Sequence, residues 1–140
     1  MVIVLVNSIY GNAQQPKIDS LKKLIAGTKT DTAKIDLYEK LGNAYRTEKK
    51  MDSSILSYKQ ALEINKKNDY SLQGQNSNTG TIAYILYEMG DYSQSVKYAE
   101  QQLLLGEQSN DAATEGGANL IIGHDYREMS EYHQSLKSLF

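Results

Sequence analysis

The sequence predicts an all-α protein, a tandem array of antiparallel helix pairs that forms an α-solenoid. Apolar residues recur at helical spacing through most of the chain. A pattern of about 40 residues occurs about three times, which is typical of helical repeat arrays. The chain also has one proline among 140 residues, as long helices require. The pattern is clearest where a large residue precedes a small one: Leu41 and Gly42, Ile82 and Ala83, Ile122 and Gly123.

The N-terminal stretch begins with an apolar run, MVIVLV, and carries no charge before Lys17. Gly11 and Ala13 are small residues at the −3 and −1 positions of a possible cleavage site before Gln14. This predicts a secretory signal peptide over residues 1–13, and with it an exported, periplasmic protein. No basic residue precedes the run, so the true start can also lie upstream, or the run can be the apolar N-terminus of a cytoplasmic protein. It is too short for a transmembrane helix, which needs about 20 apolar residues.

Residues 14–31 are predicted to form a linker and a short capping helix. Four apolar residues share one face of this helix, which is expected to end near Gly27: Ile18, Leu21, Leu24 and Ile25. A terminal helix of this kind covers the apolar flank of the first repeat. Thr30 or Asp31 is expected to cap the helix that follows.

The first two repeats are predicted over residues 32–68 and 69–109, each as a helix A, a tight turn and a helix B. Lys49 and Lys50 make the first turn, and Gly90 and Asp91 make the second. Gly106 is expected to end the second helix B.

The third repeat is predicted over residues 110–140, with helix A at residues 111–129, a turn at Ser130 and a helix B that starts at Glu131. This helix B is short and therefore looks truncated. It leaves Leu136, Leu139 and Phe140 without a following helix to bury them, which indicates further repeats or an output domain C-terminal to them.

Small residues mark the places where helices A and B are expected to approach closely. They are Gly42, Ala83 and Gly123 in helix A, and Ser54, Ser95 and Ser135 in helix B. Larger side chains there would push the helices apart. Close approach of helices is also the preferred explanation for Gly116 and Gly117, which lack the lysine and hydroxyl residue of a phosphate-binding loop.

These positions together resemble the tetratricopeptide repeat family. Repeat one carries the resemblance at Tyr38, Leu41, Gly42, Tyr45, Met51, Ser54, Tyr58 and Ala61; repeat two at Ile82, Ala83, Leu86, Gly90, Asp91, Tyr92, Ser95, Ala99 and Leu103; repeat three at Ile122, Gly123, Tyr126, Met129, Tyr132, Ser135 and Leu139. Lys49 and Ser130 replace the turn glycine, and the period exceeds the family's 34 residues. The N-terminal layout is similar to exported sensor proteins of Bacteroidetes-type bacteria, in which periplasmic repeats precede a histidine kinase or a DNA-binding output domain.

The family resemblance implies a concave binding surface on the A helices. The candidate residues are Asp36, Glu39, Asn43 and Arg46 in repeat one, Ser77, Gly80, Tyr84 and Tyr87 in repeat two, and Gly117, Leu120, His124 and Arg127 in repeat three. Aromatic and arginine side chains are common anchors in interfaces, so the expected partner is a protein or peptide in this groove. The alternative is that Tyr84 and Tyr87 pack against neighbouring helices.

Composition excludes several other functions. The chain has no cysteine, and its net charge of −2 comes from interleaved charges without a basic face for nucleic acid or membrane. His124 and His133 lack the further ligands of a metal site, no carboxylate pair is placed for acid–base chemistry, and no cofactor motif is present. We therefore expect a non-enzymatic binding scaffold, the sensory or interaction region of a larger envelope signalling protein. A structural spacer without its own ligand, or the repeat region of a cytosolic regulator, are the alternatives.

Overall fold

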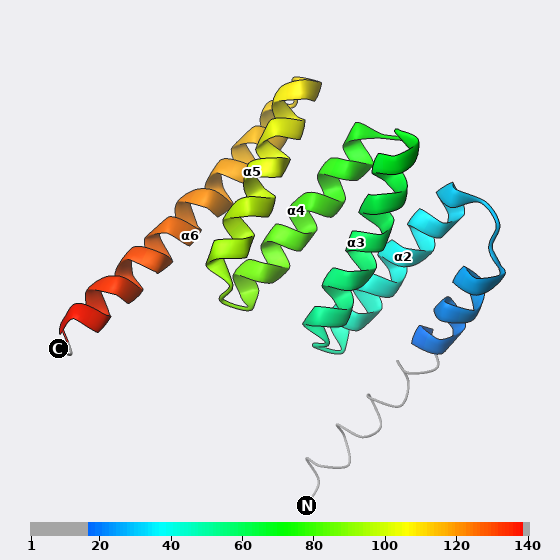
Figure 1. Ribbon diagram of the computed structural model, residues 1–140, viewed down its shortest axis with the longest axis horizontal. Helices are drawn as coiled ribbons and strands as arrows, with labels where there is room; N and C mark the ends of the chain where they lie inside the picture. The colour runs from blue at the N-terminus through cyan, green and yellow to red at the C-terminus, as the bar shows by residue number, and fades with distance from the viewer. Residues whose placement is uncertain (1–16, 139–140) are drawn as a thin grey trace, which may run out of the picture. The chain divides into compact units, whose positions relative to one another are not determined.

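The computed structural model describes residues 17–138, with side chains described to residue 133. The described chain is helical over residues 17–27 and in five longer helices, with no strand in this range: α2 (Asp31–Thr47), α3 (Met51–Asn68), α4 (Leu72–Glu88), α5 (Tyr92–Ser109) and α6 (Ala112–Ser138) (Figure 1). The predicted all-α fold of antiparallel helix pairs is confirmed. The predicted signal peptide and Phe140 lie outside the described residues, as do the side chains of Ser135, Leu136 and Leu139.

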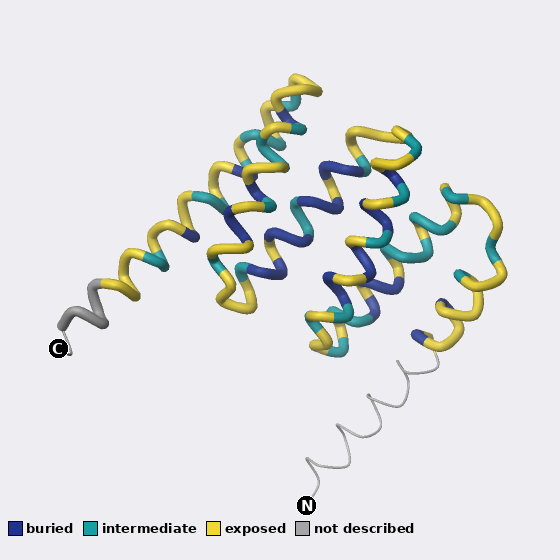
Figure 2. The backbone as a smooth tube through the Cα atoms, in the orientation of Figure 1, coloured by how far each residue is buried: buried dark blue, intermediate teal, exposed yellow. Residues whose placement is uncertain are grey.

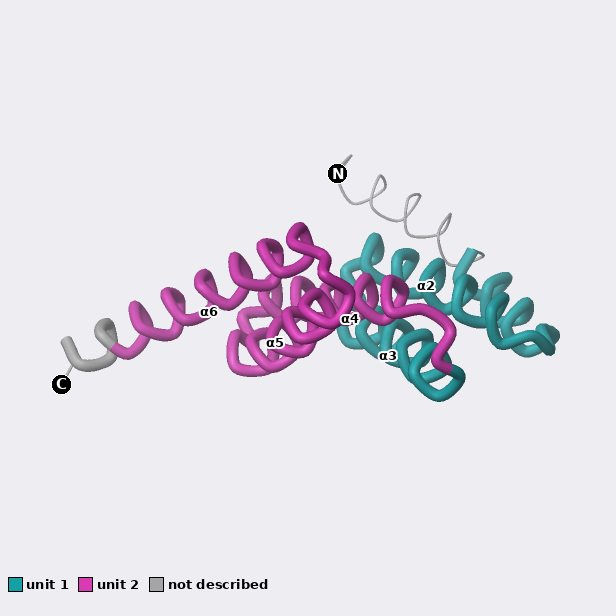
Figure 3. The backbone as a smooth tube through the Cα atoms, turned by 90° about the horizontal axis from the view of Figure 1, so that it is seen from above, with its two compact units in different colours: residues 1–68 teal, residues 69–140 magenta. Residues whose placement is uncertain are grey.

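The chain forms two compact units, residues 1–68 and residues 69–140 (Figure 3). The described part of the first unit contains the helix over residues 17–27, α2 and α3; the second contains α4, α5 and α6. Asp69, at the start of the second unit, has a φ of 50°. This left-handed conformation stops α3 and starts the short connection to α4.

The core of the first unit joins the short helix to α2. Ile18 and Leu21 of the helix over residues 17–27 pack with Leu41 and Ala44 of α2, and all four are buried. Burying large aliphatic side chains contributes about 1.5–3 kcal/mol each. This short helix therefore packs against the apolar side of α2. Neither Thr30 nor Asp31 caps α2 through its side chain, however: Thr30 is the N-cap residue but makes no capping hydrogen bond, and Asp31 lies within the first turn.

The α2–α3 pair turns at Lys49, which has a φ of 58°. Across the pair, the Ser54 hydroxyl donates a hydrogen bond to the Gly42 carbonyl oxygen over 2.8 Å. A Cβ atom at Gly42 would lie 2.7 Å from the ring of Tyr58. The predicted close approach at Gly42 and Ser54 is confirmed, because only a hydrogen atom fits between α2 and that ring.

The α4–α5 pair in the second unit repeats this arrangement. The turn is at Gly90, with a φ of 78°, and the Ser95 hydroxyl donates to the Ala83 carbonyl oxygen over 2.9 Å. The Asp91 side chain caps α5 by accepting a hydrogen bond from the Gln94 backbone nitrogen. The serine–carbonyl contact therefore occurs in both helix pairs.

The predicted end of α5 at Gly106 is wrong. The helix continues to Ser109 and ends at Asn110, which adopts the left-handed conformation with a φ of 52°. Gly106 is buried against α6, where a Cβ atom would lie 2.9 Å from Thr114 and 3.0 Å from Glu115. The glycine allows two helices to approach and does not end one.

The predicted turn at Ser130 is also wrong, because α6 runs unbroken from Ala112 to Ser138. Its second half extends past α5 (Figure 1). The aligned turn residues, Lys49 and Gly90, both have positive φ, which costs about 1–2 kcal/mol for a residue with a side chain. A continuous helix avoids this cost and keeps the backbone hydrogen bonds of α6. A Cβ atom added at Gly116, Gly117 or Gly123 would have no neighbouring atom within 4 Å. The predicted close approach of helices at these glycines is therefore wrong as well.

Candidate functional site

Four aromatic rings from three helices of the second unit form a cluster around Tyr87. Its ring centroid lies 6.4 Å from that of Tyr84, one turn earlier on α4. It lies 5.8 Å from Tyr92 of α5 and 6.2 Å from His124 of α6. These spacings are within the range at which aromatic pairs attract one another. Tyr87 is half-buried, whereas Tyr84 is 44% exposed. Tyr87 therefore packs against neighbouring helices, as the alternative expected, whereas Tyr84 keeps much of its side chain exposed.

Leu120 and Arg127 extend this cluster along α6. Leu120, His124 and Arg127 follow one another at intervals of four and three residues, so they share one side of the helix. Leu120 is 65% exposed. Arg127 is exposed and forms an ion pair with Glu128 at 3.4 Å. We call the surface made by Tyr84, Tyr87, Leu120, His124 and Arg127 the aromatic face.

The predicted residues of the first unit divide into two groups on α2. Asp36 and Asn43 are exposed, and Asp36 forms an ion pair with Lys40 at 2.6 Å. Glu39 and Arg46 are half-buried. Burial raises the pKa of the Tyr58 hydroxyl, Arg46 opposes that shift, and Glu39 adds to it. Glu39 and Arg46 therefore lie close enough to α3 to act on a residue at the α2–α3 contact.

The remaining predicted positions differ from one another. Ser77 is exposed on α4. Gly80 is half-buried, and a Cβ atom there would require the end of the Gln102 side chain of α5 to move. Gly117 has open space around it.

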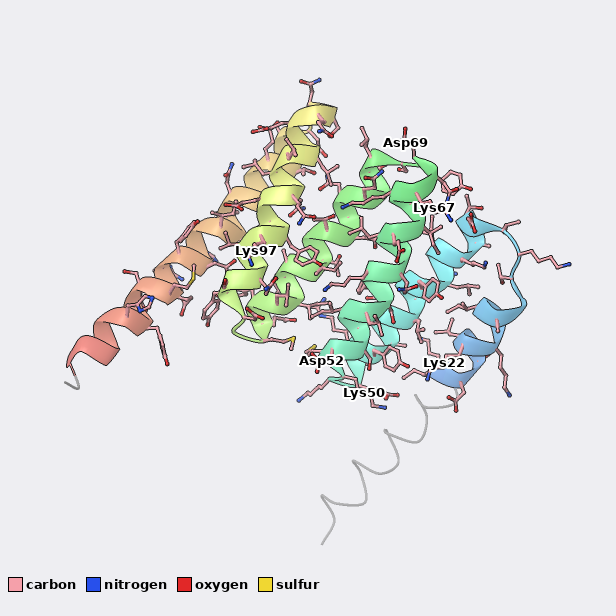
Figure 4. All side chains as sticks on the ribbon, viewed as in Figure 1. Lys22, Lys50, Asp52, Lys67, Asp69 and Lys97 are labelled. Atoms are coloured by element: carbon pink, nitrogen blue, oxygen red, sulfur yellow. The ribbon has the colours of Figure 1, made fainter. Side chains whose placement is uncertain are left out.

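A hollow in the first unit was not foreseen from the sequence. Its volume is ≈ 310 Å³, which lies near the lower end of the range for ligand pockets. It is lined by Lys22, Tyr38, Leu41, Tyr45, Ser53, Leu56, Ser57 and Gln60. The Lys22 ammonium, labelled in Figure 4, lies 5.7 Å from the centroid of the Tyr45 ring, and the Tyr45 hydroxyl raises the pKa of Lys22. Leu56, one of the lining residues, is 60% exposed.

Asp125 is a second feature that the sequence analysis missed. Its side chain is fully buried, and neither carboxyl oxygen has a hydrogen-bond partner of good geometry. Burial raises the pKa of Asp125, while the neighbouring Ser95 hydroxyl and His124 act in the opposite direction. The burial of Asp125 could have been expected from the repeat alignment, because the residues aligned with it are Ala44 and Ile85, which are both buried and apolar. A carboxyl group at this position must enter the same packed environment.

Two further features concern metal-ligand clusters and membrane-spanning helices in the part of the chain that the structure describes. Between residues 17 and 133, no three side chains of the His, Cys, Asp and Glu types gather as a metal site requires. None of the helices in the described range combines the length and apolar character needed to cross a bilayer. The chemistry available at the aromatic face is that of contact: aromatic rings, an aliphatic side chain and a guanidinium group.

Comparison with known proteins identifies the class of the first helix pair. Residues 35–68 match the tetratricopeptide repeat family, and this range covers most of α2 and all of α3. No curated protein matches the chain. The fold is thus all-α and like that of a tetratricopeptide array, and the α2–α3 pair matches that family over residues 35–68. Such repeats generally mediate protein–protein interactions.

Proposed function

We propose that this chain is a non-enzymatic scaffold that binds a protein or peptide across the aromatic face of its second unit. The observation that carries the proposal is the contact of Tyr84, Tyr87 and His124 at a surface where Tyr84 and Leu120 stay exposed. Large apolar side chains that remain exposed beside polar groups are typical of interaction sites.

The cluster also reduces the cost of binding. Tyr87 is held by rings from α5 and α6, so its orientation is set before a partner arrives. Ordering a side chain on binding costs about 0.5–1.5 kcal/mol, and a side chain that is already ordered avoids most of this cost. Tyr84 then adds aromatic surface, and Arg127 supplies a cation that can exchange Glu128 for an acidic group of the partner.

Site-specific photocrosslinking tests the surface directly. A photoreactive phenylalanine at Tyr84 is expected to crosslink the partner in the protein's own cells. Leu104 on α5 is the matched control, since it is exposed to a similar extent, 54% against 44%. The proposal fails when position 84 gives no adduct or when position 104 gives the same adducts.

Alanine substitution then tests the energy of the contact. Once crosslinking has identified a partner, its affinity can be measured for a double variant, Tyr84→Ala with Arg127→Ala. We expect binding to weaken at least tenfold, because truncating an interface anchor commonly costs roughly 2 kcal/mol or more. Leu104→Ala is expected to leave binding unchanged. If the chain is instead a structural spacer without its own ligand, every partner should be recovered equally with the natural protein, the double variant and Leu104→Ala.

The cellular setting forms the finer part of the proposal. We infer that residues 1–13 are a signal peptide and that the chain is the periplasmic sensory region of a larger envelope signalling protein. The uncharged apolar start and the small residues before Gln14 support export. Mass spectrometry of the mature N-terminus tests it: export predicts a chain that begins at Gln14. A retained Met1 on cytosolic protein would favour the cytosolic regulator instead.

A further inference from the structure

The hollow of the first unit has a single charge in its lining, and that charge is positive. We call this hollow, lined by the residues given above, the Tyr45 hollow. Lys22 is its charged residue, and the remaining lining residues are neutral at pH 7. Asp19, one turn earlier on the same helix, acts on Lys22 but does not line the hollow. An occupant with one negative charge would therefore match the lining.

The walls of the Tyr45 hollow are mostly apolar. Tyr38, Leu41 and Tyr45 follow one another at intervals of three and four residues, so they share one side of α2. Leu56 and Gln60 are four residues apart and share one side of α3. Leu41 is buried, and both tyrosines are half-buried. Two aromatic rings and two leucine side chains thus offer a surface for an apolar chain.

Lys22 lies on the open side of the Tyr45 hollow. It is exposed, and Figure 2 shows its helix, residues 17–27, exposed along most of its length. A hydrogen bond with the Tyr45 hydroxyl and the Tyr45 ring, 5.7 Å away, hold the ammonium beside α2. Ser53 and Gln60 of α3 add a hydroxyl and an amide that can donate hydrogen bonds. Donors for an anionic group therefore surround the apolar walls.

The volume of the Tyr45 hollow suits a small molecule. It is ≈ 310 Å³, room for about ten water molecules at about 30 Å³ each. A carboxylic acid with a hydrocarbon chain of medium length has a comparable size. Such a molecule also has the two properties that the lining favours, an apolar body and one negative charge.

We infer that the Tyr45 hollow binds a small amphipathic carboxylate, a molecule with one acid group and an apolar chain. The carboxylate pairs with the Lys22 ammonium, and the chain lies against Leu41, Leu56 and the rings of Tyr38 and Tyr45. The hollow belongs to the first unit and shares no residue with the aromatic face. Either proposal can therefore fail without the other.

Octanoate is the probe that tests the inference, and octanol and octylammonium are its matched neutral and cationic compounds. Isothermal titration calorimetry measures their binding to the full chain at pH 7. Octanol is expected to bind about threefold and octylammonium about tenfold more weakly than octanoate, since an exposed charge pair contributes modestly. Hexanoate is expected to bind about tenfold more weakly, because each buried methylene changes affinity about fourfold. Octanoate that does not bind, or octylammonium that binds equally well, overturns the inference.

Two neighbouring lysines provide matched variants. Lys22→Gln is expected to weaken octanoate binding about threefold and to remove the difference between octanoate and octanol, whereas Lys22→Arg keeps both. Lys23→Gln is the control, because Lys23 is also exposed on this helix but does not line the hollow. Its octanoate affinity should be unchanged. Equal affinities of Lys22→Gln and Lys23→Gln would overturn the assigned role of Lys22.

A variant that fills the hollow tests the location of the apolar chain. Ser53→Leu places an aliphatic side chain at a half-buried lining position and is expected to abolish octanoate binding. Circular dichroism checks that the variant keeps its helices. A folded Ser53→Leu protein that binds octanoate as the natural protein does would place the ligand elsewhere and overturn the inference.

Discussion

Ser54 of α3 donates its hydroxyl hydrogen to the carbonyl oxygen of Gly42 of α2 over 2.8 Å, in a buried contact between two helices. Ser95 and Ala83 repeat the contact between α4 and α5 at 2.9 Å. A serine oxygen reaches a carbonyl only when the helix axes lie close together, which also requires a small residue in the facing helix. The hydrogen bond and the small residue are therefore two parts of one packing arrangement.

Removal of the Ser54 hydroxyl is expected to weaken the first unit. Ser54→Ala should lower the free energy of unfolding by about 1 kcal/mol, because a buried hydrogen bond between helices is lost. Ser57→Ala is the matched control: Ser57 is also buried on α3, but its hydroxyl donates to the Ser53 carbonyl oxygen of its own helix. Urea denaturation followed by circular dichroism measures both. An equal loss in the two variants would contradict a special role for Ser54.

Alanine in place of glycine is expected to act in opposite directions at two positions. Gly42→Ala places a methyl group 2.7 Å from the buried Tyr58 ring, and overpacking of this kind costs about 1–3 kcal/mol. Gly116→Ala meets no atom within 4 Å and should stabilise α6 by up to about 1 kcal/mol through helix propensity. Thermal unfolding of the two variants is the measurement. A Gly42→Ala protein that gains as much stability as Gly116→Ala would contradict the tight contact.

Opposite substitutions at the two turns are expected to change stability in opposite directions. Lys49 has a φ of 58° where the second helix pair has Gly90 at 78°. Lys49→Gly removes the left-handed strain and should stabilise the protein by about 0.5 kcal/mol after the larger entropy of the unfolded glycine chain is counted.

Gly90→Ala introduces the same strain and should cost about 1 kcal/mol. Its side chain would have open space, so the backbone conformation is the only cause. Chemical denaturation of both variants checks the signs. A stabilising Gly90→Ala would show that the turn can change its conformation without cost.

Because Asp125 is buried, we expect its ionisation to lower the free energy of unfolding as pH rises. Burial raises its pKa in the folded protein, so the folded state holds the proton more tightly than the unfolded state. The stability that the bound proton of Asp125 contributes is complete below the unfolded-state pKa of about 3.9. It is lost as pH rises through the higher pKa of the folded state.

Asp125→Asn, which cannot ionise, should therefore be more stable than the natural protein at neutral pH and lose this advantage near pH 4. Urea denaturation at several pH values measures the difference. Asp36→Asn, at an exposed position on α2, is the control and should show no such gain at neutral pH. A constant difference between Asp125→Asn and the natural protein across the pH range would contradict the burial effect.

Much of the fold could be read from the sequence because local and tertiary preferences agree in the first two helix pairs. Apolar periodicity placed α2 to α5 to within a few residues, apart from the end of α5. The small residues Gly42 and Ala83 marked real contacts with Ser54 and Ser95. The aromatic-face residues were chosen by family resemblance, and the structure shows that Tyr84, Tyr87 and His124 are neighbours; binding there stays a prediction.

The features that sequence reasoning missed depend on which surfaces become covered. Asp125 looks like a polar surface residue until α6 packs against α5 and encloses it. The hollow beside Tyr45 exists only because three helices leave a gap at their meeting point. Tyr84 and Tyr87 look equivalent in the sequence, and only the positions of α5 and α6 make one a packing residue and the other an exposed one.

By itself, the sequence determined the helical class, the repeat register and the two tight turns, because these follow from apolar spacing and from the residues at each turn. The tertiary structure alone decided what happens at Ser130. A turn there would need positive φ and a covering helix to compensate for it, whereas a continuous α6 keeps its backbone hydrogen bonds. Register alone could not distinguish the two outcomes, since the same residues satisfy both.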